Sequence, residues 1–205
     1  IITGEEKDAF LLGAEIGDGC SSKSKKHITN IYSISATIDR FEQPVIAAIS
    51  GDAVGLGLEV TLACDISIAA ENSRFAMPHI KEGLIPWDGG TQRLPRLVGK
   101  AKAMEMILTG SVIDAQEALR TGLVNRIVPQ GDVSKVAMEL AKDMVSKSPV
   151  STRYAKEAIC KGMDLSLEQG LRLEADLYFL LHTTKDRKEG IRAFQEKRKA
   201  HFEGR

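Results

Sequence analysis

A glycine-rich turn between an apolar run and a helix-like segment constrains this chain more than any other feature. Residues 45–49 (VIAAI) form a continuous apolar run, which is typical of a strand covered on both faces. The turn 51–57 (GDAVGLG) follows, and residues 58–64 (LEVTLAC) continue as a helix-like segment. Glycines let a backbone approach a ligand closely, and a helix start attracts negative charge with its unpaired N–H groups. The pattern predicts a place where an anion or oxyanion can bind, with a tight packing turn as the alternative.

Two familiar nucleotide-binding motifs are excluded by the spacing of this turn. The segment 55–59 (GLGLE) lacks the third glycine of a dinucleotide fingerprint, and no Gly-Lys-Ser/Thr follows for a phosphate loop.

Composition narrows the class of protein further. The 205 residues suit one domain, or one domain with a small appendage, and they include 28 basic and 28 acidic side chains. Such a balance provides no global attraction to nucleic acid or to a membrane surface, and no apolar run approaches the ~20 residues of a spanning helix. The three cysteines form no CxxC pair, which favours free thiols in a reducing compartment. Because residues 1–4 (IITG) resemble the end of a buried strand, we expect the domain to begin upstream of residue 1.

Strands alternate with helices along the first part of the chain, and helices follow. This order predicts an α/β fold. The expected helices are 28–41, 58–64, 100–109, 114–120, 133–147, 151–161, 166–182 and 186–198, and further strands are 66–70 and 123–128. Gly110 is expected to close the helix 100–109, and Asp114 to lie near the start of the next helix. The expected caps of three later helices are Ser151, Ser166 and Asp186.

Glu59 is the first candidate catalytic residue. It lies just inside an otherwise apolar segment, where burying a carboxylate without a purpose or a partner is costly. A carboxyl group in that setting is a candidate acid/base with a raised pKa, and a buried structural ion pair is the competing interpretation.

Several segments of the chain together resemble the enoyl-CoA hydratase/isomerase (crotonase) family. The motifs that carry the resemblance are 55–65 (GLGLEVTLACD), 68–75 (IAAENSRF), 83–95 (GLIPWDGGTQRLP), 102–110 (KAMEMILTG), 114–118 (DAQEA), 122–124 (GLV) and 189–197 (EGIRAFQEK). They occur in order over essentially the whole chain. They are specific to the superfamily but much less specific to any one reaction.

The resemblance implies the crotonase (ClpP-like) fold, an α/β fold of repeated ββα units with a C-terminal helical oligomerisation region. We assign residues 1–130 to the crotonase core, with its N-terminal part missing, and residues 131–205 to the helical region. The family forms trimers, often as dimers of trimers, so a homotrimer or homohexamer is expected.

The resemblance also implies an oxyanion hole, in which two backbone N–H groups hold the thioester oxygen. These donors fall on Ala14 and on Leu56, where many relatives have glycine. Such donors stabilise an enolate where its charge develops.

Acid/base residues follow from the same resemblance. Glu59 matches the first of two glutamates that hydratases of the family use, and His79 stands where the second is expected. Asp88 lies at or beside a position where isomerases, ring-processing enzymes or dehalogenases have a working aspartate, although an N-cap of a helix starting near Thr91 is the simpler interpretation. Trp87 is expected to line the acyl pocket, with core filling as its alternative.

Contacts to coenzyme A are implied at Leu12, Ile16, Phe194 and Lys197. For Lys197, a solvated basic helix is the competing interpretation.

We therefore expect a cytoplasmic enzyme that acts on an acyl-CoA thioester through a stabilised enolate and uses no metal or redox cofactor. Coenzyme A enters only as part of the substrate, and no nucleic-acid or membrane partner is expected. A cyclic or conjugated enoyl-CoA is one candidate substrate. The alternatives are another crotonase-fold enzyme, such as an isomerase or a thioester or ring-opening hydrolase, and a non-catalytic acyl-CoA-binding subunit.

Overall fold

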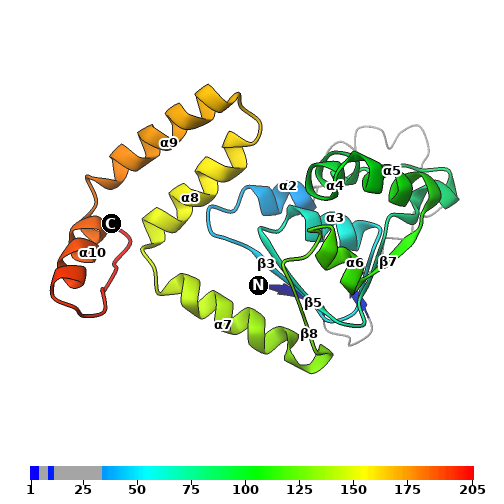
Figure 1. The fold of residues 1–205 in the computed structure, drawn as a ribbon, viewed down its shortest axis with the longest axis horizontal. Helices are drawn as coiled ribbons and strands as arrows, with labels where there is room; N and C mark the ends of the chain where they lie inside the picture. Colours follow the sequence, from blue (N-terminus) through cyan, green and yellow to red (C-terminus); the bar gives the residue numbers. More distant parts are fainter. Residues whose placement is uncertain (5–8, 12–33) are drawn as a thin grey trace, which may run out of the picture. The chain divides into compact units, whose positions relative to one another are not determined.

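The computed structural model describes residues 1–4, 9–11 and 34–205, which form two compact units (Figure 1). The first unit contains residues 1–41 and 45–138, and the second contains residues 42–44 and 139–205. The division therefore falls inside one helix, α7 (Val133–Val145). The boundary at residue 130 stays a prediction.

A fully parallel sheet lies at the centre of the first unit. Its order is β1-β3-β5-β8, formed by Ile2–Thr3, Ile46–Ile49, Ile66–Ala70 and Arg126–Val128. All four residues of β3 are buried, as the continuous apolar run predicts for a strand covered on both faces. The glycine-rich turn therefore follows a strand that is hydrogen-bonded on both sides, to β1 and to β5.

A second sheet has the order β2-β4-β6-β7, formed by Ala9–Leu11, Asp52–Val54, Arg74–Ala76 and Val112–Asp114. Its first two pairings are parallel and the β6–β7 pairing is antiparallel. The chain alternates between the sheets, since β3 leads to β4 and β5 leads to β6. The unit β3-β4-α3, in which α3 is Leu56–Ala63, is therefore one ββα repeat.

The other helical elements of the first unit are α2 (Ile34–Asp39), η2 (Pro78–Glu82), α4 (Gly90–Val98), α5 (Lys100–Thr109), α6 (Ala115–Arg120) and η3 (Gln130–Asp132). The helix predicted at 100–109 is confirmed to the residue, and Gly110 follows it in the left-handed conformation with φ 61°. Asp114 caps α6 by accepting a hydrogen bond from the N–H of Glu117. Helices α3, α4 and α5 contact one another in sequence, and Leu58, Leu94 and Met106 belong to one apolar core with Phe75.

The second unit is helical, with α8 (Pro149–Gly162), α9 (Leu167–Leu181) and α10 (Lys185–Gln195). Helices α8 and α9 pack side by side (Figure 1). Ser166 caps α9 through a complete capping box, as predicted. The caps predicted at Ser151 and Asp186 are wrong. The capping residues are Ser148 and Thr184, because both helices begin earlier than the sequence pattern indicates.

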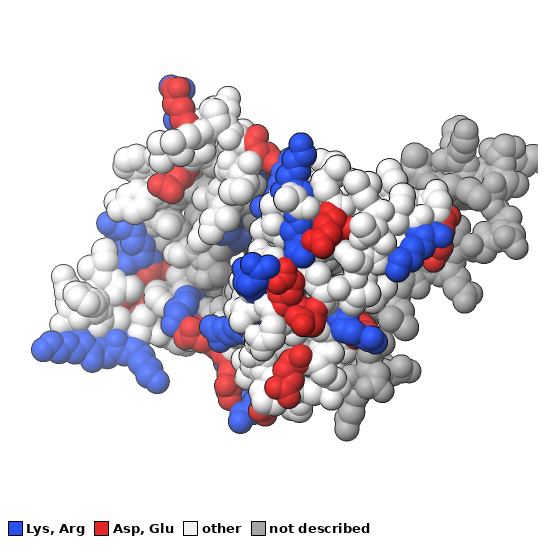
Figure 2. Space-filling view, turned by 45° about the vertical axis from the view of Figure 1, so that its right-hand side comes forward, with Lys and Arg blue, Asp and Glu red and all other residues white. Residues whose placement is uncertain are grey.

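Opposite charges are interspersed on the face of the molecule that Figure 2 shows. Ion pairs such as Lys102–Glu105 and Arg120–Glu117 join side chains of opposite charge. Within the described residues, none of the helices combines the length and the apolar character needed to cross a membrane.

Candidate functional site

Glu59 lies one turn into α3 and is completely buried, with 0% of its surface exposed. Helix α3 is apolar on nearly every side, so the fold places this carboxyl group among Leu58, Val60 and neighbouring core residues. A carboxylate in such a place needs hydrogen-bond donors or a neutral form. The structure provides donors for one of its two oxygens.

Oε1 of Glu59 accepts two backbone hydrogen bonds from the turn that opens α4. The N–H of Asp88 donates to it at 2.8 Å, and the N–H of Gly90 donates at 2.9 Å. A side chain at Gly90 would not fit, because its Cβ would lie 3.0 Å from Glu59 Oε1 and 2.7 Å from Pro86 Cβ. Glycine is therefore required where this backbone approaches the carboxylate.

The other oxygen, Oε2, is buried and has no hydrogen-bond partner among the described residues. The ionisable side chain that faces it is His79, whose Nε2 lies 3.7 Å from Oε2. That distance is longer than a hydrogen bond. Nδ1 of His79 is also buried without a partner among the described residues. The buried Oε2 of Glu59 thus lies across a short gap from Nε2 of His79, the other ring nitrogen from the buried Nδ1.

Competing effects set the acidity of Glu59. Burial raises its pKa above the ordinary value of a glutamic acid, and the negative charge of Asp88 acts in the same direction. The N–H groups of Gly90 and Asp88 oppose this effect, as does the nearby His79, but the net direction is upward. A carboxyl group with a raised pKa in a fixed position is suited to take up and return a proton near neutral pH.

Asp88 is buried, with 3% of its surface exposed, and it does not cap α4. The N-cap residue is Gly89, and α4 begins at Gly90, so the simpler interpretation of Asp88 is wrong. Its carboxylate instead accepts a hydrogen bond from the N–H of Ser35 at 3.1 Å. The hydroxyl of Ser35 donates to the backbone carbonyl of Glu59 at 3.2 Å.

Leu56 is the first residue of α3 and follows Gly55, which has φ 59°. The carbonyl of Gly55 accepts from the N–H groups of Leu58 and Glu59. The N–H of Leu56 comes before the first hydrogen bond of the helix, so it is one of the donors that a helix start leaves for other partners. The other predicted oxyanion donor, Ala14, lies outside the described residues, as do Leu12 and Ile16.

Trp87 directly precedes Asp88, and about half of its surface (49%) is exposed. It is not a core residue, which removes core filling as its role. The acyl-pocket assignment stays a prediction. Phe194 on α10 is 85% exposed, and Lys197 follows the helix with φ 53°.

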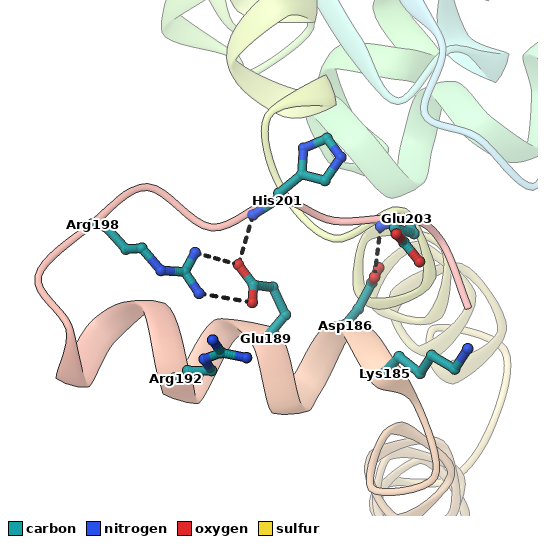
Figure 3. A pocket seen from close by; sticks show the side chains of 7 residues that line it. All are labelled: Lys185, Asp186, Glu189, Arg192, Arg198, His201 and Glu203. Atoms are coloured by element: carbon teal, nitrogen blue, oxygen red, sulfur yellow. Dashed lines mark hydrogen bonds and ion pairs between the residues drawn. The ribbon is translucent and has the colours of Figure 1, made fainter.

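A cavity of about 420 Å³ lies in the second unit (Figure 3). Its lining side chains are Lys185, Asp186, Glu189, Arg192, Arg198, His201 and Glu203. Figure 3 shows that Arg198 is bound by both oxygens of Glu189, which also accepts the N–H of His201. Glu189 therefore has a pKa lowered to about 2 by Arg198. Phe194 and Lys197 are not among the lining residues, so this cavity does not test their predicted contacts.

Three contributors to the site are absent from the sequence-based assignments. Gly90 holds the carboxylate, Ser35 holds Asp88, and Arg93 donates to the carbonyl of Asp88 at 3.0 Å. The Gly-Gly pair after Asp88 is a signal that could have pointed to a close backbone approach. Nothing local marks Ser35. Among the residues that the structure describes, no group of three or more His, Cys, Asp or Glu side chains is arranged to hold a metal ion.

Comparison with known proteins places the chain in a family. The family model described as enoyl-CoA hydratase/isomerase matches residues 1–205. The chain is 39% identical over 205 residues to the crotonyl-CoA hydratase of Syntrophomonas wolfei, covering 98% of this chain and 79% of the relative. It is 39% identical over 206 residues to the 2,3-dehydroadipyl-CoA hydratase of Escherichia coli, covering 100% of this chain and 80% of the relative.

The fold is shared with solved structures. The crystal structure of enoyl-CoA hydratase from Bacillus anthracis superimposes with a TM-score of 0.92 at 41% identity, covering 99% of this chain and 80% of that chain. The predicted crotonase fold is therefore confirmed. With a family model matched along its whole length, the chain belongs to the enoyl-CoA hydratase/isomerase family and is an enzyme of that class.

Proposed function

We propose that this enzyme adds water to an α,β-unsaturated acyl-CoA thioester through a stabilised enolate, with Glu59 and His79 as the acid/base pair. The observation that carries the proposal is the difference in hydrogen bonding between the two carboxylate oxygens of Glu59. Oε1 is fixed by two N–H groups, whereas Oε2 is buried, has no hydrogen-bond partner among the described residues, and lies 3.7 Å from His79 Nε2.

The chemistry uses both groups around one water molecule. The carboxylate of Glu59 takes a proton from water while the water oxygen bonds to the β-carbon, and the electron pair of the double bond moves to the thioester oxygen. The enolate then accepts at its α-carbon the proton that Glu59 took from the water, which completes the addition of one water and returns Glu59 to its carboxylate form. A water in contact with both Glu59 Oε2 and His79 Nε2 would be oriented for attack, and such positioned proton transfer contributes ~10²–10⁴ in rate.

His79 is favoured over Asp88 as the partner of Glu59 by its surroundings. The imidazole faces the unpaired carboxylate oxygen, whereas the carboxylate of Asp88 is engaged by the N–H of Ser35. Asp88 contributes instead through its N–H group and through its charge, which helps to raise the pKa of Glu59.

The enolate oxygen is expected to accept hydrogen bonds from the N–H groups of Leu56 and Ala14. The position of Leu56 at the start of α3 supports this role, because the first N–H groups of a helix favour negative charge. Loss of one such donor typically costs ~10²–10³ in rate.

The acyl group is proposed to be flat, cyclic or conjugated. Trp87 offers a half-exposed indole next to the turn that holds Glu59, and an aromatic ring suits a flat unsaturated group. The names of the two relatives refer to different acyl groups, crotonyl and 2,3-dehydroadipyl. Membership of the family therefore does not fix the acyl group, and we propose that residues near the site select it.

We further propose that the reaction requires no metal or redox cofactor, because water addition and proton transfer move no electrons to an external acceptor. Coenzyme A would enter as part of the substrate and contact Leu12, Ile16, Phe194 and Lys197. A homotrimer or homohexamer in the cytoplasm is proposed as the working form. Exposed apolar side chains on α8 and α9, including Ile159, Leu167 and Phe179, support self-association of the second unit.

The test is hydration of crotonyl-CoA, followed by loss of the absorbance of the conjugated thioester, with a cyclic dienoyl-CoA in parallel. Rapid turnover of either substrate is expected, and preference for the cyclic one would assign Trp87 to specificity. His79→Gln should lower kcat by ~10²-fold or more. His182→Gln, a change of the same kind at an exposed position, is the matched control. Equal turnover by both variants would contradict the role of His79, and coenzyme A thioester binding without any turnover would contradict hydration.

A further inference from the structure

Arg93 joins two parts of the first unit that flank Glu59. Its Nη1 donates to the backbone carbonyl of Asp88 at 3.0 Å, and its Nη2 pairs with the carboxylate of Asp39 at the end of α2. The side chain is largely covered, with 27% of its surface exposed. One guanidinium group therefore links α2 to the turn that precedes α4.

Arg93 and this turn are fitted to each other closely. Gly89 has φ +105°, and a Cβ at that position would lie 1.8 Å from Nη1 of Arg93. The guanidinium thus occupies the space where any other residue would place its side chain. The N–H of Arg93 also donates to the carbonyl of Gly89 at 2.8 Å. The Gly89 conformation and the Arg93 side chain together define the path of the backbone here.

The same short turn carries both N–H groups that hold Oε1 of Glu59, at Asp88 and Gly90. Helix α2 supports the turn at two points, since Ser35 donates to the Asp88 carboxylate and Asp39 anchors Arg93. Any shift of the Asp88–Gly90 backbone would move the donors of Oε1 and redirect Oε2.

We propose that Arg93, anchored by Asp39, is a positioning residue for catalysis that fixes the Asp88–Gly90 turn and thereby aims Glu59 Oε2 at the substrate. The inference rests on the catalytic role proposed for Glu59. The competing interpretation is a partly exposed ion pair that contributes only a little stability. The carbonyl bond to Asp88 and the fit at Gly89 go beyond such a pair, because they act on the donors of the carboxylate itself.

The experiment compares Arg93→Met with Arg96→Met on crotonyl-CoA, or on the cyclic dienoyl-CoA if that is the better substrate. Arg96 is the matched control, because it lies on the same helix, is exposed, and within the described part of the chain donates to the carbonyl of Gln92 alone. Arg93→Met should lower kcat by roughly 10- to 100-fold, the size expected of a misplaced catalytic group, with little change in KM. Arg96→Met should keep wild-type kcat.

A pH profile separates positioning from stability. The N–H groups of Gly90 and Asp88 pull the pKa of Glu59 down against burial, and His79 acts in the same direction while Asp88 charge opposes it. If the turn loosens, the pKa of Glu59 rises, so the acid limb of kcat should move to higher pH in Arg93→Met. The limb should stay in place in Arg96→Met. Unchanged kcat and an unmoved limb in folded Arg93→Met would overturn the proposal.

Two further variants keep the result decisive. If Arg93→Met does not fold, Asp39→Asn removes the charge of the anchor and should give a smaller loss of kcat with the same movement of the limb. Added methylguanidine should restore part of the activity of Arg93→Ala, and absence of any recovery together with an unmoved limb in Asp39→Asn would refute the role.

Glu59→Gln is run in parallel to test the proposed function itself. If it keeps full turnover, the proposed function of Glu59 fails, whereas an inactive Glu59→Gln beside a fully active Arg93→Met defeats only the inference about Arg93.

Discussion

Each of the two units contains an acidic residue with at most 2% of its surface exposed, and the hydrogen bonds of these two residues, Glu59 and Asp186, differ. Asp186, in the second unit, is 2% exposed and has partners on both oxygens. Its Oδ1 accepts from the N–H groups of Glu203 and Gly204, and its Oδ2 accepts from Gly204 and from the hydroxyl of Ser148. Glu59, in the first unit, is 0% exposed, and the residues that the structure describes provide donors to its Oε1 alone.

We interpret this difference as one between a structural carboxylate and the carboxylate that we propose to be catalytic. A buried carboxylate that is satisfied on every side fastens chain segments together, and in the second unit it ties the C-terminal residues to α10 and to the start of α8. A buried carboxylate with one oxygen unpaired retains the ability to bind a water or to accept a proton. Burial alone therefore does not distinguish these two carboxylates, whereas their hydrogen bonds do.

The largest expected effect is that of Glu59→Gln on turnover. Glutamine keeps an oxygen for the N–H groups of Asp88 and Gly90 but cannot act as a base, so kcat should fall by ~10²–10⁴. The free energy of unfolding should not decrease, because a buried charge is removed. Steady-state kinetics and denaturant titration measure the two quantities. Full turnover by this variant would erase the contrast between the two carboxylates.

Gly90→Ala should have the next largest effect. The added Cβ would lie 3.0 Å from Glu59 Oε1 and 2.7 Å from Pro86 Cβ, so the carboxylate and the turn must move. We expect kcat to fall by ~10²-fold, together with a loss of ~1–3 kcal/mol in the free energy of unfolding. Gly131→Ala is the control, because its Cβ would enter open space and should change stability by no more than ~0.5 kcal/mol. Equal kinetics for both variants would contradict the role given to the close approach.

Asp186→Asn tests the structural role of the buried carboxylate in the second unit. An asparagine has one acceptor oxygen, so its amide group would face donors that the carboxylate now satisfies, including the N–H groups of Glu203 and Gly204. The free energy of unfolding should fall by ~1–3 kcal/mol, as measured by denaturant titration. A variant as stable as the wild type would show that these hydrogen bonds are replaceable by solvent.

The smallest expected effect is a pH dependence of stability. Since the pKa of Glu59 is raised in the folded state, the folded form binds a proton more tightly than the unfolded form. The stability contributed by protonation is present at acid pH and is lost as pH rises through the folded pKa. The stability advantage of Glu59→Gln over the wild type should therefore be greatest at neutral pH and should shrink toward acid. Unfolding titrations across this range would contradict the prediction if the difference grew on acidification.

Local patterns predicted many of the elements. The helix 100–109, Gly110 at its end and the position of Asp114 near a helix start each depend on residues within a few positions of one another, and all three are confirmed. The predicted start of α10 was late, because Thr184 provides its cap while the carboxylate of Asp186 is used by distant backbone groups. In sequence, a residue that caps a helix cannot be told from one that binds distant backbone groups when both are acidic or hydroxylic.

The contacts around Glu59 were not predictable in the same way. Its burial followed from its apolar neighbours, but its partners lie 29 and 31 residues away, and Ser35 lies 53 residues from Asp88. No short period in a sequence encodes which distant segments meet. The positions of Leu12, Ala14 and Ile16 fall outside the described residues, so those assignments stay predictions.

The sequence by itself determined the family, the order of strands and helices, and the presence of a carboxyl group in an apolar helix. Those properties reside in motifs and in hydrophobic periodicity, which are local. Only the tertiary structure decided that, among the described residues, Glu59 has partners on one oxygen and none on the oxygen beside His79, while Asp186 has partners on both. The reason is physical. Hydrogen-bond satisfaction depends on which donors the folded chain brings within about 3 Å, and that distance is set by packing between segments far apart in sequence.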